Sequence, residues 1–276
     1  MIFLKNFAFI NLFFFVVYIN LSLATEVKLI WDPNINDPDL GGYKVYFGTK
    51  SRTYGTPIDV GNLTSYTIQN LNLNTPYFFA VTAYDTNGLE SDYSEEIGVL
   101  IKDLRAGWNL ISIPLSIGLV PLTEYIFPSN LNKIEKILTY KASDTNDPWK
   151  VYDPSAPSYV NDLVELNETL GLWIKAKEDM NLILYGKFIP NSNLPLSVGW
   201  NLIQYPGIQK KPVTEALSSI SGKYEKILYY QASDLQDPWK VYDPAAPSYV
   251  NDLKELEPGG GYWIKVKENC TWIISN

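Results

Sequence analysis

The sequence predicts a mainly β protein, in which a β-sandwich is followed by two small α+β repeat domains. Three observations predict this fold. Between residues 26 and 101, turn residues separate short stretches in which apolar residues alternate with others, a pattern typical of half-buried strands. The rest of the chain repeats itself at an offset of about 90 residues. The chain has one cysteine, so its stability has to come from packed cores and not from intrachain disulfides.

The first element, residues 1–24, is expected to be a secretory signal peptide. Lys5 precedes an apolar run over residues 7–19 that is too short to span a bilayer. Ser22 and Ala24 are small residues at the two positions that a signal peptidase reads, which predicts cleavage after Ala24. An uncleaved membrane anchor is the alternative. We therefore expect an exported protein, periplasmic, secreted or at the cell surface, with no membrane span after cleavage.

The second element is a domain over residues 25–101. Alternating apolar residues predict a strand over 27–31. Further strands are expected over residues 43–47, 66–68 and 77–84, with turn residues at regular intervals between them. Many short strands with this spacing are typical of an antiparallel sandwich.

Motifs within this domain point to a family. Leu-x-Trp-Asp-Pro occupies residues 29–33, and Leu-Gly-Gly-Tyr-Lys-Val-Tyr-Phe-Gly-Thr occupies residues 40–49. Ala-Tyr-Asp-x-x-Gly-x-x-Ser-x-x-Ser then begins at Ala83. Over residues 26–101 the chain resembles the fibronectin type III family, and within it the bacterial branch.

The resemblance implies roles for two aromatic residues. Trp31 would be the indole in the core between the two sheets. Tyr77 would be the tyrosine-corner residue, whose hydroxyl ties a loop to the backbone. The family usually has proline where this chain has Leu73. Because the chain contains no Arg-Gly-Asp sequence, recognition of the integrin type is not implied.

Two aromatic-rich repeats follow, at residues 102–190 and 191–276. The recurring segments are GWNLI at 107–111 and 199–203, DPWKVYDP at 147–154 and 237–244, and GLWIK at 171–175 with GYWIK at 261–265. The order expected within each repeat is strand, helix, strand, strand, short helix or turn, strand, strand. With these motifs the repeats resemble those of predicted bacterial exported proteins, a family about which little functional knowledge exists.

Local patterns support that order. Apolar residues at i, i+3, i+4 and i+7 behind Pro212 predict a helix start with one apolar face. Residues 134–140 and 224–230 alternate as half-buried strands do. Asp-Pro and Ala-Pro pairs over residues 153–157 predict a turn-rich loop.

Composition excludes several classes of function. The formal net charge of -8 does not suit binding to nucleic acid or to an anionic membrane. Histidine is absent, which excludes histidine-based catalytic triads, c-type haem attachment and most zinc sites. Cys270 has Met180 as its counterpart, which predicts a small buried hydrophobic side chain. We expect no catalytic residues, no cofactor and no metal site.

Two carboxylate-rich segments were the candidates for chemistry. Asp147 and Asp153 flank Trp149, and paired carboxylates beside an indole superficially suit glycoside hydrolysis. Each of these aspartates precedes a proline, however, where carboxylates commonly cap turns. The loop over residues 32–39 is rich in oxygen ligands, but its spacing matches no EF-hand.

Aromatic side chains remain as candidates for binding, because they can stack on sugar rings. Those that flank the Pro-rich loop can escape the core. The candidate ligand-binding residues are Trp149, Tyr152 and Tyr159 in the first repeat and Trp239, Tyr242 and Tyr249 in the second. Asn161, Asp162, Asn251 and Asp252 would add hydrogen bonds or cap turns. We expect Trp108, Trp173, Trp200 and Trp263 in cores, and partial exposure of Trp149 and Trp239.

Two classes of function remain. Export, modular repeats and missing catalytic signatures favour an exported non-catalytic binding, adhesion or envelope scaffold protein. Its partner would be an unknown surface polysaccharide or protein. The alternative is a secreted polysaccharide-active enzyme or its accessory subunit, suggested by the clustering of Trp and Asp.

Overall fold

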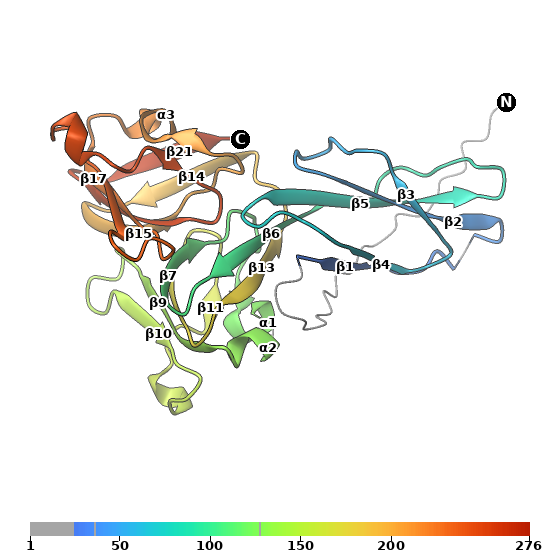
Figure 1. The fold of residues 1–276 in the computed structure, drawn as a ribbon, viewed down its shortest axis with the longest axis horizontal. Helices are drawn as coiled ribbons and strands as arrows, with labels where there is room; N and C mark the ends of the chain where they lie inside the picture. The colour runs from blue at the N-terminus through green and yellow to red at the C-terminus, as the bar shows by residue number, and fades with distance from the viewer. Residues whose placement is uncertain (1–24, 36, 127) are drawn as a thin grey trace. The chain divides into compact units, whose positions relative to one another are not determined.

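The computed structural model describes residues 25–35, 37–126 and 128–276 (Figure 1). The expected signal peptide lies outside the described residues. The chain divides into two compact units, Met1–Ile101 and Lys102–Asn276. Both are built mainly from strands, as the sequence predicts. Within the described ranges, no helix is long and apolar enough to cross a membrane.

Unit 1 contains two antiparallel sheets (Figure 1). In the smaller sheet, β1 (Val27–Ile30) pairs with β4 (Ser65–Ile68). The strands that unit 1 contributes to the larger sheet follow the order β3-β2-β5-β6, with β2 (Leu40–Gly48), β3 (Ile58–Gly61), β5 (Pro76–Asp85) and β6 (Ile97–Leu104).

Both aromatic roles implied for unit 1 are confirmed. Trp31 is 2% exposed, and its ring lies edge-on to that of Tyr43 with centroids 5.7 Å apart. The hydroxyl of Tyr77 accepts a hydrogen bond of 3.1 Å from the backbone nitrogen of Asn72. The tyrosine corner therefore forms although Leu73 stands where the family usually has proline.

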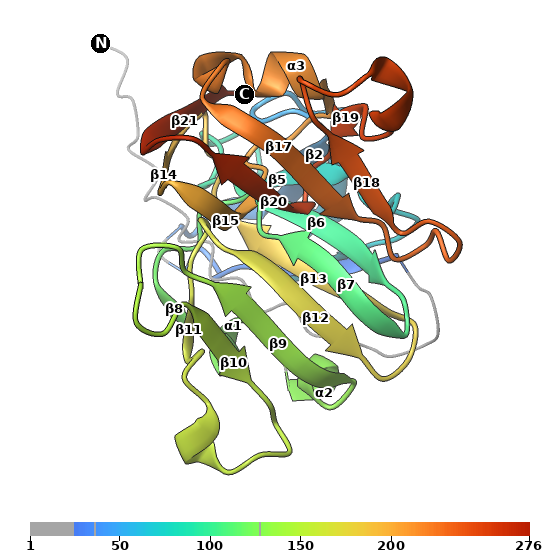
Figure 2. The same cartoon turned by 90° about the vertical axis from the view of Figure 1, so that its left-hand side faces the viewer.

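Unit 2 contains the two repeats, and each has a four-stranded antiparallel sheet (Figure 2). The order is β10-β9-β12-β7 in repeat 1 and β18-β17-β20-β15 in repeat 2, so equivalent strands occupy equivalent places. The prediction of one shared topology is confirmed. The strands are β7 (Gly107–Ser112), β9 (Ile134–Tyr140), β10 (Trp149–Tyr152) and β12 (Gly171–Ala176), and β15 (Gly199–Gln204), β17 (Tyr224–Tyr230), β18 (Trp239–Tyr242) and β20 (Gly261–Val266).

Short elements complete each repeat. The helices are single turns, α1 (Leu122–Tyr125) and α2 (Pro128–Leu131) in repeat 1 and α3 (Val213–Ala216) in repeat 2, and further 3-10 turns cover Ser158–Val160, Ser218–Ile220 and Ser248–Val250. The remaining strands are β8 (Val120–Pro121), β11 (Glu165–Leu166) and β13 (Met180–Gly186), and β14 (Asn191–Leu196), β16 (Lys211–Pro212), β19 (Glu255–Leu256) and β21 (Cys270–Ser275). The apolar face predicted behind Pro212 is buried, although the chain changes from α-helix to 3-10 helix along it.

The two faces of each sheet have different neighbours. Alternate residues of a strand point to opposite faces. On β20, Ile264 and Val266 belong to the hydrophobic core of repeat 2. Gly261 and Trp263 therefore lie on the other face of the same strand, and both contact repeat 1.

The second faces of the two sheets meet through reciprocal contacts. Ile111 bridges to Gly260, and Leu170 bridges to Ile203. In the repeat alignment Ile111 is equivalent to Ile203, and Leu170 to Gly260. Each repeat thus offers the same patch to the other, which is the geometry of a twofold interface.

Two glycines allow this approach. A Cβ atom on Gly171 would lie 2.8 Å from the carbonyl oxygen of Ile203. A Cβ atom on Gly261 would lie 2.4 Å from the carbonyl oxygen of Ile111. Only a residue without a side chain fits such a contact, which gives a physical reason for glycine at these equivalent positions.

Candidate functional site

Eight aromatic side chains gather where the two repeats meet, in two groups of four. Each group combines two rings from one repeat with two from the other. We name them cluster A, which consists of Tyr140, Trp149, Trp200 and Trp263, and cluster B, which consists of the equivalents Tyr230, Trp239, Trp108 and Trp173.

Cluster A is centred on Trp263. The centroid of its ring lies 5.2 Å from that of Tyr140, 5.7 Å from that of Trp149 and 6.1 Å from that of Trp200. The rings of Tyr140 and Trp149 are themselves 5.3 Å apart and near-perpendicular, at 72°. These distances and tilts are typical of favourable aromatic pairs.

Cluster B repeats this arrangement around Trp173. Its ring centroid lies 5.1 Å from that of Tyr230, 5.8 Å from that of Trp239 and 6.0 Å from that of Trp108. The ammonium group of Lys175 lies 5.9 Å from the ring centroid of Trp108, where a cation–π contact forms. The agreement between the clusters shows that the pseudo-twofold relation extends to side chains.

Strand register builds each cluster. Trp149 opens β10 directly opposite Tyr140 on β9, and Trp239 opens β18 directly opposite Tyr230 on β17. Directly opposed residues on adjacent antiparallel strands lie on the same face of the sheet. Because β10 and β18 are edge strands, the two indoles stand at the outer limit of their sheets.

Exposure differs within the clusters. Trp149 is 44% exposed and Trp239 is 43% exposed, which confirms the partial exposure expected of them. The expectation that the other four tryptophans occupy cores is wrong, since all four are only partly buried: Trp108, Trp173, Trp200 and Trp263. They lie on the sheet face opposite the core of their own repeat, and the other repeat covers them incompletely.

The candidate residues in each repeat do not form one surface. Trp149 and Tyr152 are three residues apart on β10, so their side chains point to opposite faces. Tyr242, the equivalent of Tyr152, packs against the hydrophobic core of repeat 2. Tyr159 and Tyr249 are each 86% exposed in 3-10 turns. Only Trp149 and Trp239 belong to the clusters.

The rings that sequence reasoning missed are Tyr140 and Tyr230. Both end strands that the alternation predicts. A signal was present, because both stand immediately before the loop that leads to the exposed tryptophan in each copy. Pairing the two strands of each hairpin would have brought tyrosine and tryptophan together.

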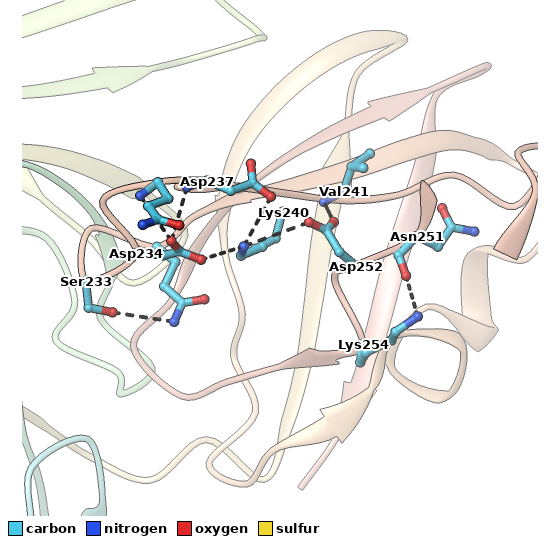
Figure 3. Close-up of polar contacts among 10 residues, drawn as sticks. Ser233, Asp234, Asp237, Lys240, Val241, Asn251, Asp252 and Lys254 are labelled. Atoms are coloured by element: carbon cyan, nitrogen blue, oxygen red, sulfur yellow. Dashed lines mark hydrogen bonds and ion pairs between the residues drawn. The ribbon is translucent and has the colours of Figure 1, made fainter. Parts of the chain in front are cut away.

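A lysine braces the hairpin that carries each exposed tryptophan. Lys240 follows Trp239 and lies between three carboxylates in Figure 3, with Nζ–Oδ2 distances of 2.8 Å to Asp234, 3.5 Å to Asp237 and 3.9 Å to Asp252. Asp252 also accepts a hydrogen bond of 2.6 Å from the backbone nitrogen of Val241. The hairpin loop and the segment after the Pro-rich loop are thereby tied to one side chain.

Repeat 1 has the same bracing. The Nζ of Lys150 lies 3.1 Å from Asp144, 3.0 Å from Asp147 and 3.6 Å from Asp162. Hydrogen bonds from the backbone of Asp147 and from Lys150 lower the pKa of the Asp144 carboxyl. In repeat 2 the hydrogen bond from Lys240 is the main cause that lowers the pKa of Asp234.

The two aspartates considered for hydrolysis have other partners. Asp147 pairs with Lys150. Asp153 accepts hydrogen bonds from the hydroxyl of Ser155 at 2.6 Å and from its backbone nitrogen at 2.9 Å, which lower the pKa of this carboxyl. Asp153 therefore caps a turn, as the proline after it suggested.

Asn161 and Asn251 also hold turns. The Oδ1 of Asn251 accepts a hydrogen bond of 2.8 Å from the backbone nitrogen of Asp243, and its Nδ2 donates one of 3.0 Å to the carbonyl oxygen of Asp243. Asn161 makes the equivalent pair of bonds to Asp153. Of the two predicted roles, these asparagines have the structural one.

The acidic side chains and the single cysteine were the remaining candidates for a metal site and a reactive thiol. Among the described residues, which omit residue 36 in the oxygen-rich loop, no group of three or more His, Cys, Asp or Glu could hold a metal ion. Cys270 is partly buried and packs against the core of repeat 2, and burial raises the pKa of its thiol. It has the packing role that its counterpart Met180 suggested.

The part of the chain that matches a known family lies in unit 1. The family model of the fibronectin type III domain matches residues 20–99. No curated protein matches the chain. Residues 20–99 of unit 1 therefore match the fibronectin type III family, and the two repeats lie outside the match.

Two solved structures resemble the chain at low similarity. The crystal structure of chicken CNTN1 FN1-FN3 domains is 15% identical, with 97% of this chain and 98% of that chain covered and a TM-score of 0.23. Chitinase ChiA74 from Bacillus thuringiensis is 14% identical, with 64% of this chain covered and a TM-score of 0.23. The alignment spans 26% of the chitinase.

Proposed function

We propose that the chain is an exported, non-catalytic binding protein, in which the repeats present aromatic clusters A and B to a surface polysaccharide. The observation that carries the proposal is the exposure of Trp149 and Trp239, at 44% and 43%, each within a cluster of four rings. An exposed aromatic patch with polar surroundings is typical of an interaction site.

The chemistry of the clusters favours a glycan. Indole and phenol rings offer flat apolar faces to the C–H groups of a sugar ring, and their N–H and O–H groups can bond to its hydroxyls. The net charge of -8 does not suit nucleic acid. A neutral polysaccharide meets no such electrostatic opposition.

The carboxylates support a binding role without catalysis. A glycoside hydrolase commonly needs one carboxylic acid whose pKa is raised, so that it can protonate the leaving group. Near the exposed tryptophans the pKa is instead lowered at Asp144, Asp153 and Asp234, where hydrogen-bond donors hold the charged form. These side chains brace the binding hairpins.

Retention on insoluble polysaccharides tests the proposal. The mature chain would be incubated with cellulose, chitin, xylan and starch granules, and the bound fraction and any released reducing sugar would be measured. We expect retention on at least one polymer without sugar release. The double variant Trp149→Ala/Trp239→Ala should bind about tenfold more weakly, since the stacking faces are removed.

A matched pair of substitutions provides the control. Tyr159→Ala/Tyr249→Ala removes the two aromatic residues with the greatest exposure, 86% each, which belong to neither cluster. This variant should bind like the parent, and circular dichroism should show that both double variants are folded. The proposal is contradicted if the folded tryptophan variant is retained as strongly as the parent. It is also contradicted if the parent is not retained on any polymer, or if reducing sugar is released.

Export has its own test. The full chain would be produced in a bacterial host, the cell fractions separated and the N-terminus of the product determined by mass spectrometry. We expect the protein outside the cytoplasm with Thr25 as its first residue. Retention of residues 1–24 on a cytoplasmic product would contradict export.

A further inference from the structure

A pocket of about 300 Å³ opens beside cluster A. Residues of both repeats line it, and Tyr140 belongs both to this lining and to the cluster. Leu202 also lines the pocket, two residues along β15 from Trp200 of the cluster. The volume is at the lower end of the range for small-ligand sites, which begins at roughly 300 Å³.

The lining of this pocket combines apolar with polar side chains and is almost uncharged. Ser143, Asn167 and Thr169 contribute hydroxyl and amide groups, and Lys141 is the one charged residue among the described residues that line it. Such neutral donors and acceptors match sugar hydroxyls.

Asn167 holds a fixed orientation at the pocket. Its Oδ1 accepts hydrogen bonds from the backbone nitrogen of Thr169 at 2.9 Å and from the hydroxyl of the same residue at 2.6 Å. Because the oxygen is engaged, the amide nitrogen is the group that remains to donate to a ligand. A fixed donor in a pocket favours recognition, since little conformational entropy is lost on binding.

The pseudo-twofold relation provides an internal comparison. At the position in repeat 2 equivalent to Asn167 stands Glu257, and Leu194 of the pocket lining has Lys102 as its equivalent. Lys102 and Glu257 form an ion pair of 3.4 Å, and Lys102 is 5% exposed. The hydroxyl of Tyr229 donates a further hydrogen bond of 2.8 Å to Glu257. At the positions equivalent to two residues of the pocket lining, an ion pair of long charged side chains therefore stands near cluster B.

We propose that the pocket and cluster A form one binding site for two adjacent neutral sugar residues, whereas cluster B offers aromatic stacking alone, to a long polymer. One sugar stacks on Trp149 and Trp263, and the next enters the pocket and accepts the hydrogen bond of Asn167. This inference rests on the proposed glycan binding. It adds that a short oligosaccharide binds at one site per chain, although the sequence repeats twice, and that cluster B contributes only to retention on a long polymer.

Titration calorimetry with cellohexaose, chitohexaose, xylohexaose and maltohexaose tests this. The mature chain should bind at least one of them at one site per chain. Trp149→Ala should weaken the affinity for the oligosaccharide at least about tenfold, whereas Trp239→Ala should lower retention on the insoluble polymer and change the oligosaccharide affinity less than about twofold. Two equal sites, or equal losses for the two variants, would overturn the single site and leave glycan binding intact. Absence of binding to the oligosaccharides and to the insoluble polymers would overturn both proposals.

A matched pair of substitutions tests the pocket itself. Ser143 lies on the exposed loop of the pocket lining, and Ser233 is its exposed equivalent in repeat 2, which Figure 3 labels. Ser143→Trp should fill the pocket and weaken binding at least about tenfold, and Ser233→Trp should bind like the parent. Unchanged affinity of a folded Ser143→Trp variant would remove the pocket from the site.

Exchange of residues between repeats gives an independent test. Asn167→Glu/Leu194→Lys places the equivalents of Glu257 and Lys102 in the pocket lining without a change in net charge. It should abolish the pocket and weaken binding as Ser143→Trp does, with thermal unfolding as the check on folding. A folded exchange variant with the affinity of the parent would overturn the proposal.

Discussion

The two repeats share a topology but fill their cores with different side chains. Tyr125 stands in the first helix of repeat 1, where repeat 2 has Ala216. On the last strand the sizes are reversed, because Leu182 in repeat 1 corresponds to Trp272 in repeat 2. A large ring therefore comes from the helix in one copy and from the strand in the other. The topology persists because cores tolerate different residues when volume and pattern are kept.

The large core ring makes a hydrogen bond in both repeats. The indole nitrogen of Trp272 donates a bond of 2.7 Å to the carbonyl oxygen of Ala216. The ring of Tyr125 stacks on that of Tyr185 with centroids 4.7 Å apart, and its hydroxyl donates a bond of 2.9 Å to the carbonyl oxygen of Tyr185. In each copy the large ring also satisfies its buried polar group, as burial requires.

The largest effect should come from removing the ring of repeat 2. Trp272 is fully buried, at 0% exposure, so Trp272→Ala should destabilise the protein by about 3–5 kcal/mol through lost burial and the cavity left behind. Chemical denaturation of the mature chain measures this, with Trp149→Ala as the control. Because Trp149 is 44% exposed, its loss should cost clearly less, and equal costs would contradict the difference between core and cluster.

Giving repeat 2 the core residues of repeat 1 tests this difference directly. Trp272→Leu alone should leave a cavity, whereas Trp272→Leu/Ala216→Tyr should recover part of the lost stability, because Tyr refills the space from the helix. A double variant that is no more stable than Trp272→Leu would show that the two cores are not interchangeable.

The second effect concerns the contact between the repeats. A methyl group at Gly261 would meet the carbonyl oxygen of Ile111 at 2.4 Å, and at Gly171 the corresponding distance is 2.8 Å. Gly261→Ala should therefore cost about 1–3 kcal/mol, and Gly171→Ala somewhat less. Gly55→Ala is the control, since its Cβ would lie at an ordinary 3.8 Å from its nearest atom. If Gly261→Ala and Gly55→Ala have the same denaturation midpoint, the close approach at Gly261 is contradicted.

Much of this architecture could be predicted from the sequence. The repeat offset correctly placed Trp149 and Trp239 on equivalent strands, because identical segments have identical local preferences. Strand β14 was missed, although its residues alternate between exposed and buried positions. Asn and Pro weaken its strand propensity, and its pairing with β21, at the far end of repeat 2, stabilises it instead.

The site was harder to predict than the fold. Local sequence showed that Trp149 could escape the core, but its neighbour Trp263 lies in the other repeat. No local pattern contains that contact, which depends on the packing of one sheet on the other. The same packing kept the four other tryptophans out of the cores, since it provides a second, partly covered face.

The third effect concerns the carboxylate of Glu257, where repeat 1 has the uncharged Asn167. Burial alone would raise the pKa of Glu257, but Lys102, the hydrogen bond from Tyr229 and Lys210 outweigh it, and the pKa is lowered. The resulting stability is present above the ordinary glutamate pKa and is lost as the pH falls through the lower value of the folded protein. Glu257→Gln should cost about 1–2 kcal/mol at pH 7, less than a fully buried pair, because Glu257 is 26% exposed.

The pH dependence provides the measurement. Denaturation of parent and Glu257→Gln would be compared from pH 7 downwards. The difference in unfolding free energy should shrink as the pH falls below roughly 4.3. Asn167→Asp in repeat 1 is the matched control, since it adds a carboxylate at the equivalent position, where Leu194 replaces the paired lysine. A constant difference across this pH range would contradict the assigned charge interaction.

The smallest effect should come from the lysines that brace the tryptophan hairpins. Lys240 and Lys150 each hold three aspartates, and hydrogen bonds to Asp234 and Asp147 respectively are the main causes that raise their pKa values. Exposed ion pairs contribute little to global stability, so Lys240→Met and Lys150→Met should leave the denaturation midpoint nearly unchanged. The removal of the brace should instead appear locally, as faster hydrogen exchange in the loop before the tryptophan of the altered repeat alone. Because salt screens exposed charges, high ionic strength should accelerate exchange in both loops of the parent and have little further effect in the altered loop. Equal exchange in the altered and unaltered repeats would show that backbone hydrogen bonds, such as the one that Val241 donates to Asp252, hold the exposed indoles in place without the lysines.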